Sequence, residues 1–275
     1  MKLRTLCVAP GVLVMLGLFF LPLLIVLGYS FLSRGAYGGV MLPWTFESYR
    51  RIFDALYLAI LWRSIWIAAV STALCLVLAF PLALYVARAG VRKTLLLNLV
   101  MLPFWTSFLI RTYAWMFLLR DTGLVNSLLE SLHIISSPLP LLFNTGAVIL
   151  GLVYGYLPFM VLPLYATLER LDRNLLEAAA DLGARPWSTL TRIVIPLCAP
   201  GIRAGATLVF IPCLGAYLTP DLLGGGKSVM IGNLIQNQFT TARDWPFGSA
   251  VSLALMAIVM ALLVAFLRRE DEGLL

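Results

Sequence analysis

Six long apolar stretches constrain the fold of this chain more than any other feature of its sequence. A helix needs about 20 mostly apolar residues to cross the hydrocarbon core of a bilayer. Backbone groups inside lipid must bond to one another, and the stretches lack the alternating pattern of membrane strands, so we expect helices. The expected spans are residues 8–32, 64–87, 95–119, 145–168, 201–223 and 248–267. The predicted fold class is an all-α polytopic membrane protein with six transmembrane helices.

The composition supports this fold class. Hydrophobic residues make up 61% of the 275 residues and charged residues 12%, whereas soluble domains average about 45–50% and about 25%. The net charge of +7 does not indicate a nucleic-acid partner, because the basic residues are scattered at the ends of the apolar stretches. The four cysteines lack paired spacing, so we expect them to pack as small apolar residues and to form neither a disulfide nor a metal site.

Basic residues predict the orientation in the membrane. Cytoplasmic loops carry an excess of Lys and Arg, and short loops follow this rule best. The short loop at 88–93 is basic, as is the C-terminal pair Arg268 and Arg269, so we expect both termini in the cytoplasm. The apolar run after Lys2 and Arg4 exceeds the core of about 7–15 residues of a signal peptide. It predicts an uncleaved first helix in the cell (inner) membrane.

A polar segment of about thirty residues, 169–200, separates two of the apolar spans. Asp172 is placed to cap a short helix, and Gly183 to end it in the left-handed conformation. Pro186 suits the first turn of a second short helix, which we expect Pro196 and Pro200 to end before the next span. Such a helix pair either lies on the membrane surface or inserts into a groove of a partner protein.

The order of residues within this segment resembles the coupling loop of binding-protein-dependent ABC importer permeases. The pattern is Glu-Ala-Ala at 177–179, three residues, Gly183, nine residues, and then Ile193 followed by Pro196. Ile195 stands where the family usually has Leu. The resemblance implies a type I ABC importer permease fold, in which the short helix sits in a cleft of the ATPase. The residues that it implies for coupling are Glu177, Ala178, Ala179, Asp181, Gly183, Ile193 and Pro196.

The resemblance also implies the organisation and the partners of the chain. We expect a first transmembrane helix with an outer loop at 1–63, the permease core at 64–268 and a cytoplasmic tail at 269–275. The expected partners are an ATP-binding cassette ATPase dimer, a second homologous permease subunit, an extracytoplasmic solute-binding protein and the lipid bilayer. ATP and Mg are expected on the ATPase, so this chain is expected to hold no cofactor and to carry no enzyme chemistry.

Two further stretches resemble the first permease subunit of spermidine/putrescine (polyamine) importers. One is residues 103–115, and the other combines the glycine-rich run at 222–232 with residues 243–248. Relatives with the same motifs carry opine-type or amino-acid-like solutes, which remain the alternative substrates. The run Gly226-Lys227-Ser228 does not predict a phosphate-binding loop, because Asp221 stands where that motif needs glycine.

Four residues are candidates for the substrate path because aromatic faces and carboxylates recognise ammonium groups. An ionisable residue inside a membrane span is costly and is a functional candidate by default. Asp221 is either a transient cation site or an interfacial acid at a helix end. The candidates are Asp221, Tyr217, Tyr113 and Trp115.

Arg111 is the one ionisable residue within its expected span, and its role is left open between structure or gating and the path. It either braces the helix against carbonyls, or pairs with an acid such as Asp221. A role in the path suits an anionic or zwitterionic solute. An ion-coupled secondary transporter and a channel are the competing classes, but paired midplane carboxylates, typical of the former, are scarce here.

Overall fold

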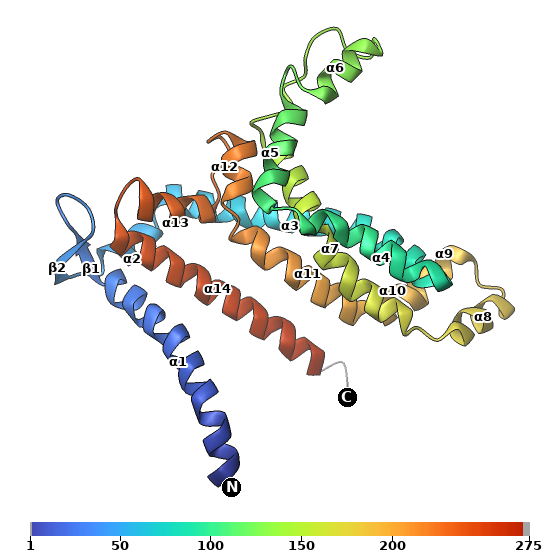
Figure 1. Cartoon of the computed structure of the whole chain (residues 1–275), viewed down its shortest axis with the longest axis horizontal. Helices are drawn as coiled ribbons and strands as arrows, with labels where there is room; N and C mark the ends of the chain where they lie inside the picture. Colours follow the sequence, from blue (N-terminus) through green and yellow to red (C-terminus); the bar gives the residue numbers. More distant parts are fainter. Residues whose placement is uncertain (1, 272–275) are drawn as a thin grey trace. The chain divides into compact units, whose positions relative to one another are not determined.

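Figure 1 shows the computed structural model, which describes residues 2–271. Within that range the side chains of residues 2–7, 9, 173 and 265–271 are not described. The charges of Lys2, Arg4, Arg268 and Arg269, and most of the tail predicted at 269–275, therefore lie outside the described residues.

Helices form most of the described chain, which confirms the all-α class. They are α1 (Lys2–Ser30), α2 (Glu47–Ile52), α3 (Ala55–Arg88), α4 (Lys93–Met101), α5 (Phe108–Leu119), α6 (Leu124–Ser131), α7 (Thr145–Glu169), α8 (Arg173–Asp181), α9 (Pro186–Thr189), α10 (Ile195–Leu197), α11 (Ala199–Leu214), α12 (Leu218–Gly224), α13 (Ile231–Thr240) and α14 (Trp245–Asp271). The sequence did not predict the antiparallel hairpin of β1 (Leu32–Arg34) and β2 (Val40–Trp44), in which Ser33 faces Met41.

Four helical segments of the described chain are long and apolar enough to cross a membrane. They lie at Pro10–Ser30, Ala55–Arg88, Thr145–Glu169 and Trp245–Val264. Two bent pairs raise the number to six when each pair counts as one span: Gly90–Trp105 with Phe108–Ser131, bent by 86°, and Pro186–Leu197 with Ala199–Leu214, bent by 67°. The six expected spans are therefore present only if the third and fifth are broken.

The third expected span, 95–119, is wrong as a single straight helix. Thr106 and Ser107 leave the helical region, with ψ angles of 151° and 137°. The Thr106 hydroxyl donates to the carbonyl of Pro103 at 2.7 Å and so satisfies an acceptor that a continuing helix would have used. The chain therefore turns between the 3-10 turn Leu102–Trp105 and α5.

The fifth expected span, 201–223, is also wrong as one helix, because α11 ends at Leu214 and α12 starts only at Leu218. The start of α13 covers the break between them. The Asn233 side chain donates to the Tyr217 carbonyl at 2.6 Å, and a Cβ on Gly232 would lie 2.5 Å from the carbonyl oxygens of Gly215 and Ala216. The backbone groups freed by the break are thus partly satisfied by this segment.

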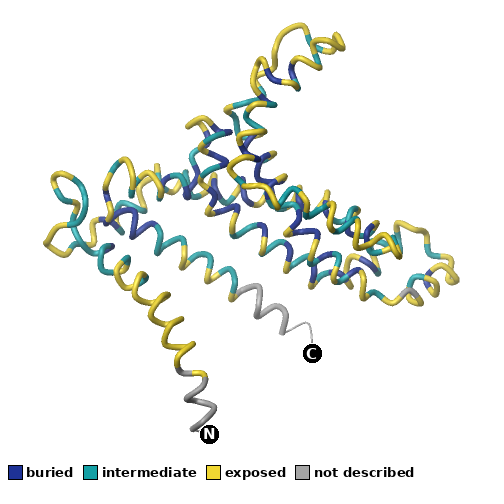
Figure 2. Tube along the Cα trace, viewed as in Figure 1, coloured by how far each residue is buried: buried dark blue, intermediate teal, exposed yellow. Residues whose placement is uncertain are grey.

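The chain divides into two compact units. The first holds Met1–Ile60 and Leu234–Leu262, and the second holds Leu61–Asn233 and Leu263–Leu275. In the first unit, most of α1 is exposed (Figure 2), and none of its apolar window is buried. It is held near its C-terminal end, where the Ser30 and Tyr49 hydroxyls lie 2.8 Å apart and the Tyr29 ring lies 6.0 Å from that of Trp245.

The second unit is built around α7, which packs against α11, α12 and α5. More than half of its most apolar window is buried, 56%, as the dark segments of Figure 2 show. Small residues let the helix backbones approach closely, as is common between membrane helices. A Cβ on Gly205 of α11 would lie 2.7 Å from the sulfur of Met160, and one on Gly155 of α7 would lie 2.9 Å from the Phe108 ring.

We expect Gly151→Val to destabilise the protein. A Cβ at this position of α7 would lie 2.5 Å from Leu223 and 2.7 Å from Thr219 of α12, and overpacking of this kind costs about 1–3 kcal/mol. The measurement is the thermal midpoint of the protein in detergent. Gly17→Val in α1 is the matched control, since nothing lies within 4 Å of a Cβ there. Equal midpoints for the two variants would contradict the packing described here.

Candidate functional site

The first candidate region is α8 with its caps. The Asp172 carboxylate accepts a hydrogen bond from the Asn174 backbone N–H at 2.9 Å, which confirms the predicted N-cap. Gly183 has φ +77°, as the sequence predicted. Its N–H donates to the Ala180 carbonyl, and the N–H of Ala184 donates to the Ala179 carbonyl, both at 2.9 Å. This pair of hydrogen bonds forms a Schellman cap, so both ends of α8 are fixed by local residues.

The second half of the segment follows expectation at its ends but not between them. Pro186 occupies the first turn of α9, as predicted. The helical run ends between Pro196 and Pro200, as expected, since α10 stops at Leu197 and Pro200 lies in the first turn of α11. Ile193 lies in a π-helical turn, Leu190–Val194. The bend of 67° comes only at Cys198, before α11.

The surface of α8 and α9 has the composition of a protein docking site. The side chains of Glu177, Ala178 and Asp181 are exposed, whereas Ala179 is buried. Leu182 is 89% exposed and Trp187 74% exposed. Large apolar side chains held in the open beside carboxylates are typical of a surface that a partner covers.

A cavity of about 340 Å³ separates α8 from the helices behind it. It is lined by the ends of α3 and α7 and by the start of α8, through Leu84, Ala87, Arg88, Leu168, Glu169, Leu171, Leu176 and Glu177. Lys93 at the start of α4 donates to the Glu169 carboxylate at the end of α7. The base of the segment is therefore tied to its neighbours by an ion pair, and the cavity lies between α8 and the ends of α3 and α7.

The second candidate region surrounds Arg111 on α5. Arg111 is only 9% exposed, and its guanidinium carbon lies 4.5 Å from the ring centre of Phe104 and 5.7 Å from that of Phe108. Its Nε and Nη1 atoms are buried without a hydrogen-bond partner. The pair with Asp221, one of the roles left open for Arg111, does not form. The ion pairs among the described side chains are Arg51–Asp244 and Lys93–Glu169, and Asp221 is exposed on α12.

Three aromatic pairs join α5 and the turn before it to α7. Their ring centres lie 5.5 Å apart for Trp115 and Tyr154, 6.2 Å for Phe108 and Tyr156, and 5.2 Å for Phe104 and Phe159. The α7 members were missed in the sequence because they lie inside an apolar run. The signal that could have found them is the clustering of three aromatic residues within six positions of one expected span.

The predicted path residues form two groups. Trp115 lies one helical turn after Arg111, so both occupy one face of α5. Tyr113 lies two positions from each, which places it on another face of the same helix, 40% exposed. Tyr217 and Asp221 lie at the start of α12, both exposed. α12 packs against α5 and α7, so the two groups come from neighbouring elements of the second unit.

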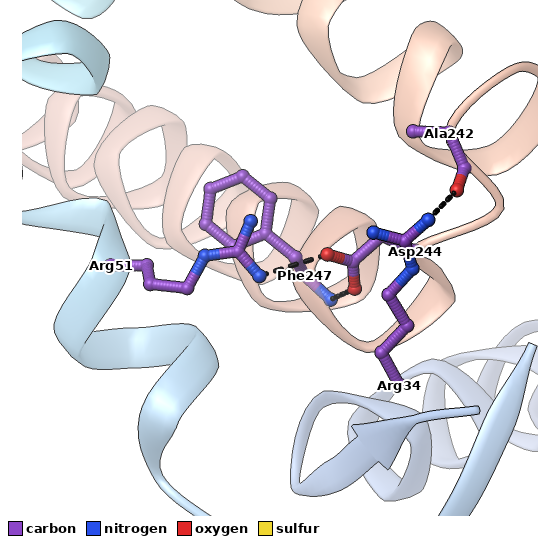
Figure 3. A network of polar contacts seen from close by, with 5 residues as sticks. All are labelled: Arg34, Arg51, Ala242, Asp244 and Phe247. Atoms are coloured by element: carbon purple, nitrogen blue, oxygen red, sulfur yellow. Dashed lines mark hydrogen bonds and ion pairs between the residues drawn. The ribbon is translucent and has the colours of Figure 1, made fainter. Parts of the chain in front are cut away.

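A third feature, in the first unit, is a polar network that we call the outer clasp (Figure 3). Arg51 Nη1 lies 2.8 Å from Asp244 Oδ2, and Asp244 is 2% exposed by its side chain. The other oxygen of Asp244 accepts from the Phe247 N–H at 3.2 Å and so caps α14. The Arg51 guanidinium stacks on the Phe247 ring at 4.2 Å. Arg34 donates to the Ala242 carbonyl at 2.7 Å.

The electrostatics of the outer clasp favour the charged pair. Burial of Arg51 lowers the pKa of its guanidinium, but hydrogen bonds and Coulomb attraction from Asp244 and Tyr57 outweigh burial, so this pKa is raised. The pair could not be predicted from the sequence, because Arg51 and Asp244 are 193 positions apart. The local signal was Asp244 at the N-cap position of an apolar helix.

The comparison with known families decides the class of this protein. The family described as "Binding-protein-dependent transport system inner membrane component" matches residues 39–269. The chain belongs to this family. Membership in this permease family confirms the resemblance found in the sequence, the transport class and the inner-membrane location.

Individual permeases are similar over most of the chain. The spermidine/putrescine transport system permease protein PotB of Escherichia coli K12 is 44% identical over 250 residues, which are 90% of this chain and 91% of that protein. The same protein of Haemophilus influenzae is 44% identical over 253 residues, 92% and 88%. The inner membrane ABC transporter permease protein YdcU of Escherichia coli K12 is 36% identical over 240 residues, 82% and 75%.

Solved structures confirm the type I permease fold. A bacterial alginate ABC transporter in complex with an alginate pentasaccharide-bound periplasmic protein matches with a TM-score of 0.78 at 16% identity, over 96% of this chain and 92% of that one. The inward-facing MetNI methionine ABC transporter matches with a TM-score of 0.53 at 19% identity, over 78% and 93%. At these identities the likeness concerns the fold alone.

We expect Asp244→Ala to destabilise the permease through the outer clasp. The substitution removes the partner of Arg51 and the cap of Phe247 together, and leaving such groups unsatisfied costs about 1–3 kcal/mol. The thermal midpoint in detergent measures the loss. Asp54→Ala is the control, because Asp54 is an exposed acid of the same unit. A midpoint as high as that of the control would show that the clasp does not stabilise the fold.

Proposed function

We propose that this chain is one of two permease subunits of an ATP-driven importer that carries a polyamine such as spermidine or putrescine. An external solute-binding protein delivers the substrate. The observation that supports this most directly is the 44% identity, over 90% of the chain, to permease proteins of spermidine/putrescine transport systems. The exposed, doubly capped α8 supports the ATP-driven part of the proposal.

The coupling step uses the surface of α8 and α9. Leu182 and Trp187 provide the apolar anchors for a groove on the ATPase, and Glu177 and Asp181 provide charges at the rim. Ala178 allows close approach. ATP and Mg bind on the ATPase, and this chain holds no cofactor. One such segment per chain implies two permeases for an ATPase dimer, and the second is a homologous subunit.

Movement passes from α8 into the membrane core through its base. The Lys93–Glu169 pair ties the end of α7 to α4, and α7 in turn packs against α5, α11 and α12. The cavity behind α8 leaves space for a rigid tilt when the ATPase closes. Rocking of packed helices around a central path then gives alternating access.

The orientation follows from this coupling. The α8 face lies in the cytoplasm, together with both termini and the basic loop at 88–93. With a cytoplasmic N-terminus and one crossing by the first span, the loop that follows it up to residue 63 is assigned to the external side, where the solute-binding protein arrives.

The α5–α7–α12 region supplies the chemistry for a polycation. Ammonium groups bind over aromatic faces, which Trp115 and Tyr154 offer on neighbouring helices, with Tyr113 exposed on another face of α5. The Asp221 carboxylate beside Tyr217 provides a transient site for the opposite charge.

A second candidate function is import of an opine or amino-acid-like solute by the same machinery. Arg111 favours it, because a buried guanidinium with two nitrogens that lack an acceptor is suited to bind a substrate carboxylate. An ion-coupled carrier is the weaker alternative.

Stimulation of ATP hydrolysis by substrates tests the proposed function. The permease is reconstituted with its second permease, ATPase and binding protein, and spermidine, putrescine, an opine and amino acids are added in turn. We expect stimulation by the polyamines alone, and uptake into vesicles that requires ATP when the membrane potential is held constant. Stimulation confined to the opine or to amino acids would refute the polyamine assignment, and uptake without ATP would refute the importer class.

We also expect Gly183→Val to uncouple the importer. A left-handed residue with a side chain costs about 1–2 kcal/mol, enough to shift the population of the capped α8 by about 5–30-fold. Because no atom lies within 4 Å of a Cβ there, the change acts on the backbone alone. Gly183→Asn is the control, since asparagine tolerates this conformation. Polyamine-stimulated ATP hydrolysis should fall in the valine variant and persist in the asparagine variant.

A further inference from the structure

Arg111 has a charge that the second unit of this chain leaves unmatched. Arginine keeps its charge in every protein environment, and this side chain is more than nine-tenths buried. Two of its guanidinium nitrogens, Nε and Nη1, are buried and have no acceptor. Buried donors of native proteins are almost always hydrogen-bonded, so an acceptor is missing from the chain as it stands alone.

The surrounding side chains do not replace that acceptor. Phe104 and Phe108 hold the guanidinium over their rings at 4.5 Å and 5.7 Å. Such stacking attracts the charge, but it leaves the N–H groups without partners. The guanidinium is therefore positioned by the two rings, and what it binds comes from elsewhere.

None of the described carboxylates forms an ion pair with Arg111. Among the described side chains, Asp244 pairs with Arg51 and Glu169 pairs with Lys93. Asp221, on the short helix packed against α5, is exposed and makes no ion pair with Arg111. Arg111 keeps 9% of its surface exposed, but Nε and Nη1 are covered by this chain, so an acceptor from another molecule reaches them only when the covering side chains move aside.

From these observations we infer that Arg111 binds a carboxylate side chain of the second permease subunit across the interface between the two membrane domains. The inference rests on the proposed function in one respect: a polycationic substrate has no carboxylate to offer. A guanidinium and a carboxylate fit each other through charge-assisted hydrogen bonds. The pair also cancels a positive charge that would repel a polyamine passing along the neighbouring aromatic pairs.

Loss of the Arg111 charge should have different effects on the isolated chain and on the assembly. Arg111→Met keeps an apolar stem against Phe104 and removes the unmatched charge. Replacing an unpaired buried charge by an apolar side chain does not weaken a fold. The variant expressed without its partners should therefore keep its level in the membrane and its thermal midpoint. In the assembly it leaves the carboxylate of the partner unpaired, so association should weaken by at least about tenfold.

The experiment measures co-purification of the second permease with tagged Arg111→Met, beside the midpoint of the variant alone. Arg120→Met is the matched control, because Arg120 also stacks on a ring, that of Phe117 at 4.7 Å, but is exposed. A loss of association with Arg111→Met alone supports the pair. Unchanged association overturns it, and so does a lower midpoint of the isolated variant, which would assign Arg111 to the fold of its own chain.

Charge reversal identifies the acceptor. Arg111→Glu should abolish uptake, and selection for restored uptake should yield replacement of an acidic residue by Lys or Arg in the second permease. Suppressors confined to this chain or to the binding protein, or a variant that assembles but changes its substrate, overturn the inference. The polyamine assignment is tested separately on the wild-type complex. The association experiment can therefore be interpreted even if no polyamine stimulates ATP hydrolysis.

Discussion

The close approach of α7 to its neighbours is the constraint on which the second unit depends. Membrane helices gain little from the hydrophobic effect among themselves, because lipid tails are as apolar as their side chains. Their association relies on contact at short range, and this is what Gly151 and Gly155 on α7 and Gly205 on α11 allow. The aromatic pairs, α12 and the base of α8 all take their positions from this central helix.

The ends of α8 were predictable because they depend on local contacts, whereas the breaks in two spans depend on contacts that a sequence average does not reveal. Asp172 and Gly183 act through bonds to residues two to three positions away, so the sequence could place both ends of the helix. The breaks in the third and fifth spans could not be found in this way. A hydropathy average sees only apolar residues there, whereas the fold depends on the Thr106 hydroxyl and on Asn233 reaching back across sixteen positions.

The candidate site was predictable in part: the coupling motif could be located from the sequence, but the surroundings of the path residues could not. The coupling residues lie in one contiguous motif, but the pattern did not give their exposure, since Glu177, Ala178 and Asp181 are exposed whereas Ala179 is buried. The path residues were chosen for their chemistry within spans that were expected to be straight, and the break before α5 changes the faces on which they lie. Arg111 was singled out as unusual. Its neighbours Phe104 and Phe108 lie one on each side of a turn that was not predicted from the sequence.

The outer clasp gives the first unit an unusual mechanical property. A single carboxylate, Asp244, holds α2 with one oxygen and the first turn of α14 with the other. The hairpin is tied to the same loop, since Arg34 and Gly39 bond to the carbonyls of Ala242 and Arg243. A displacement of the hairpin is thus transmitted directly to the beginning of α14, without passing through α1.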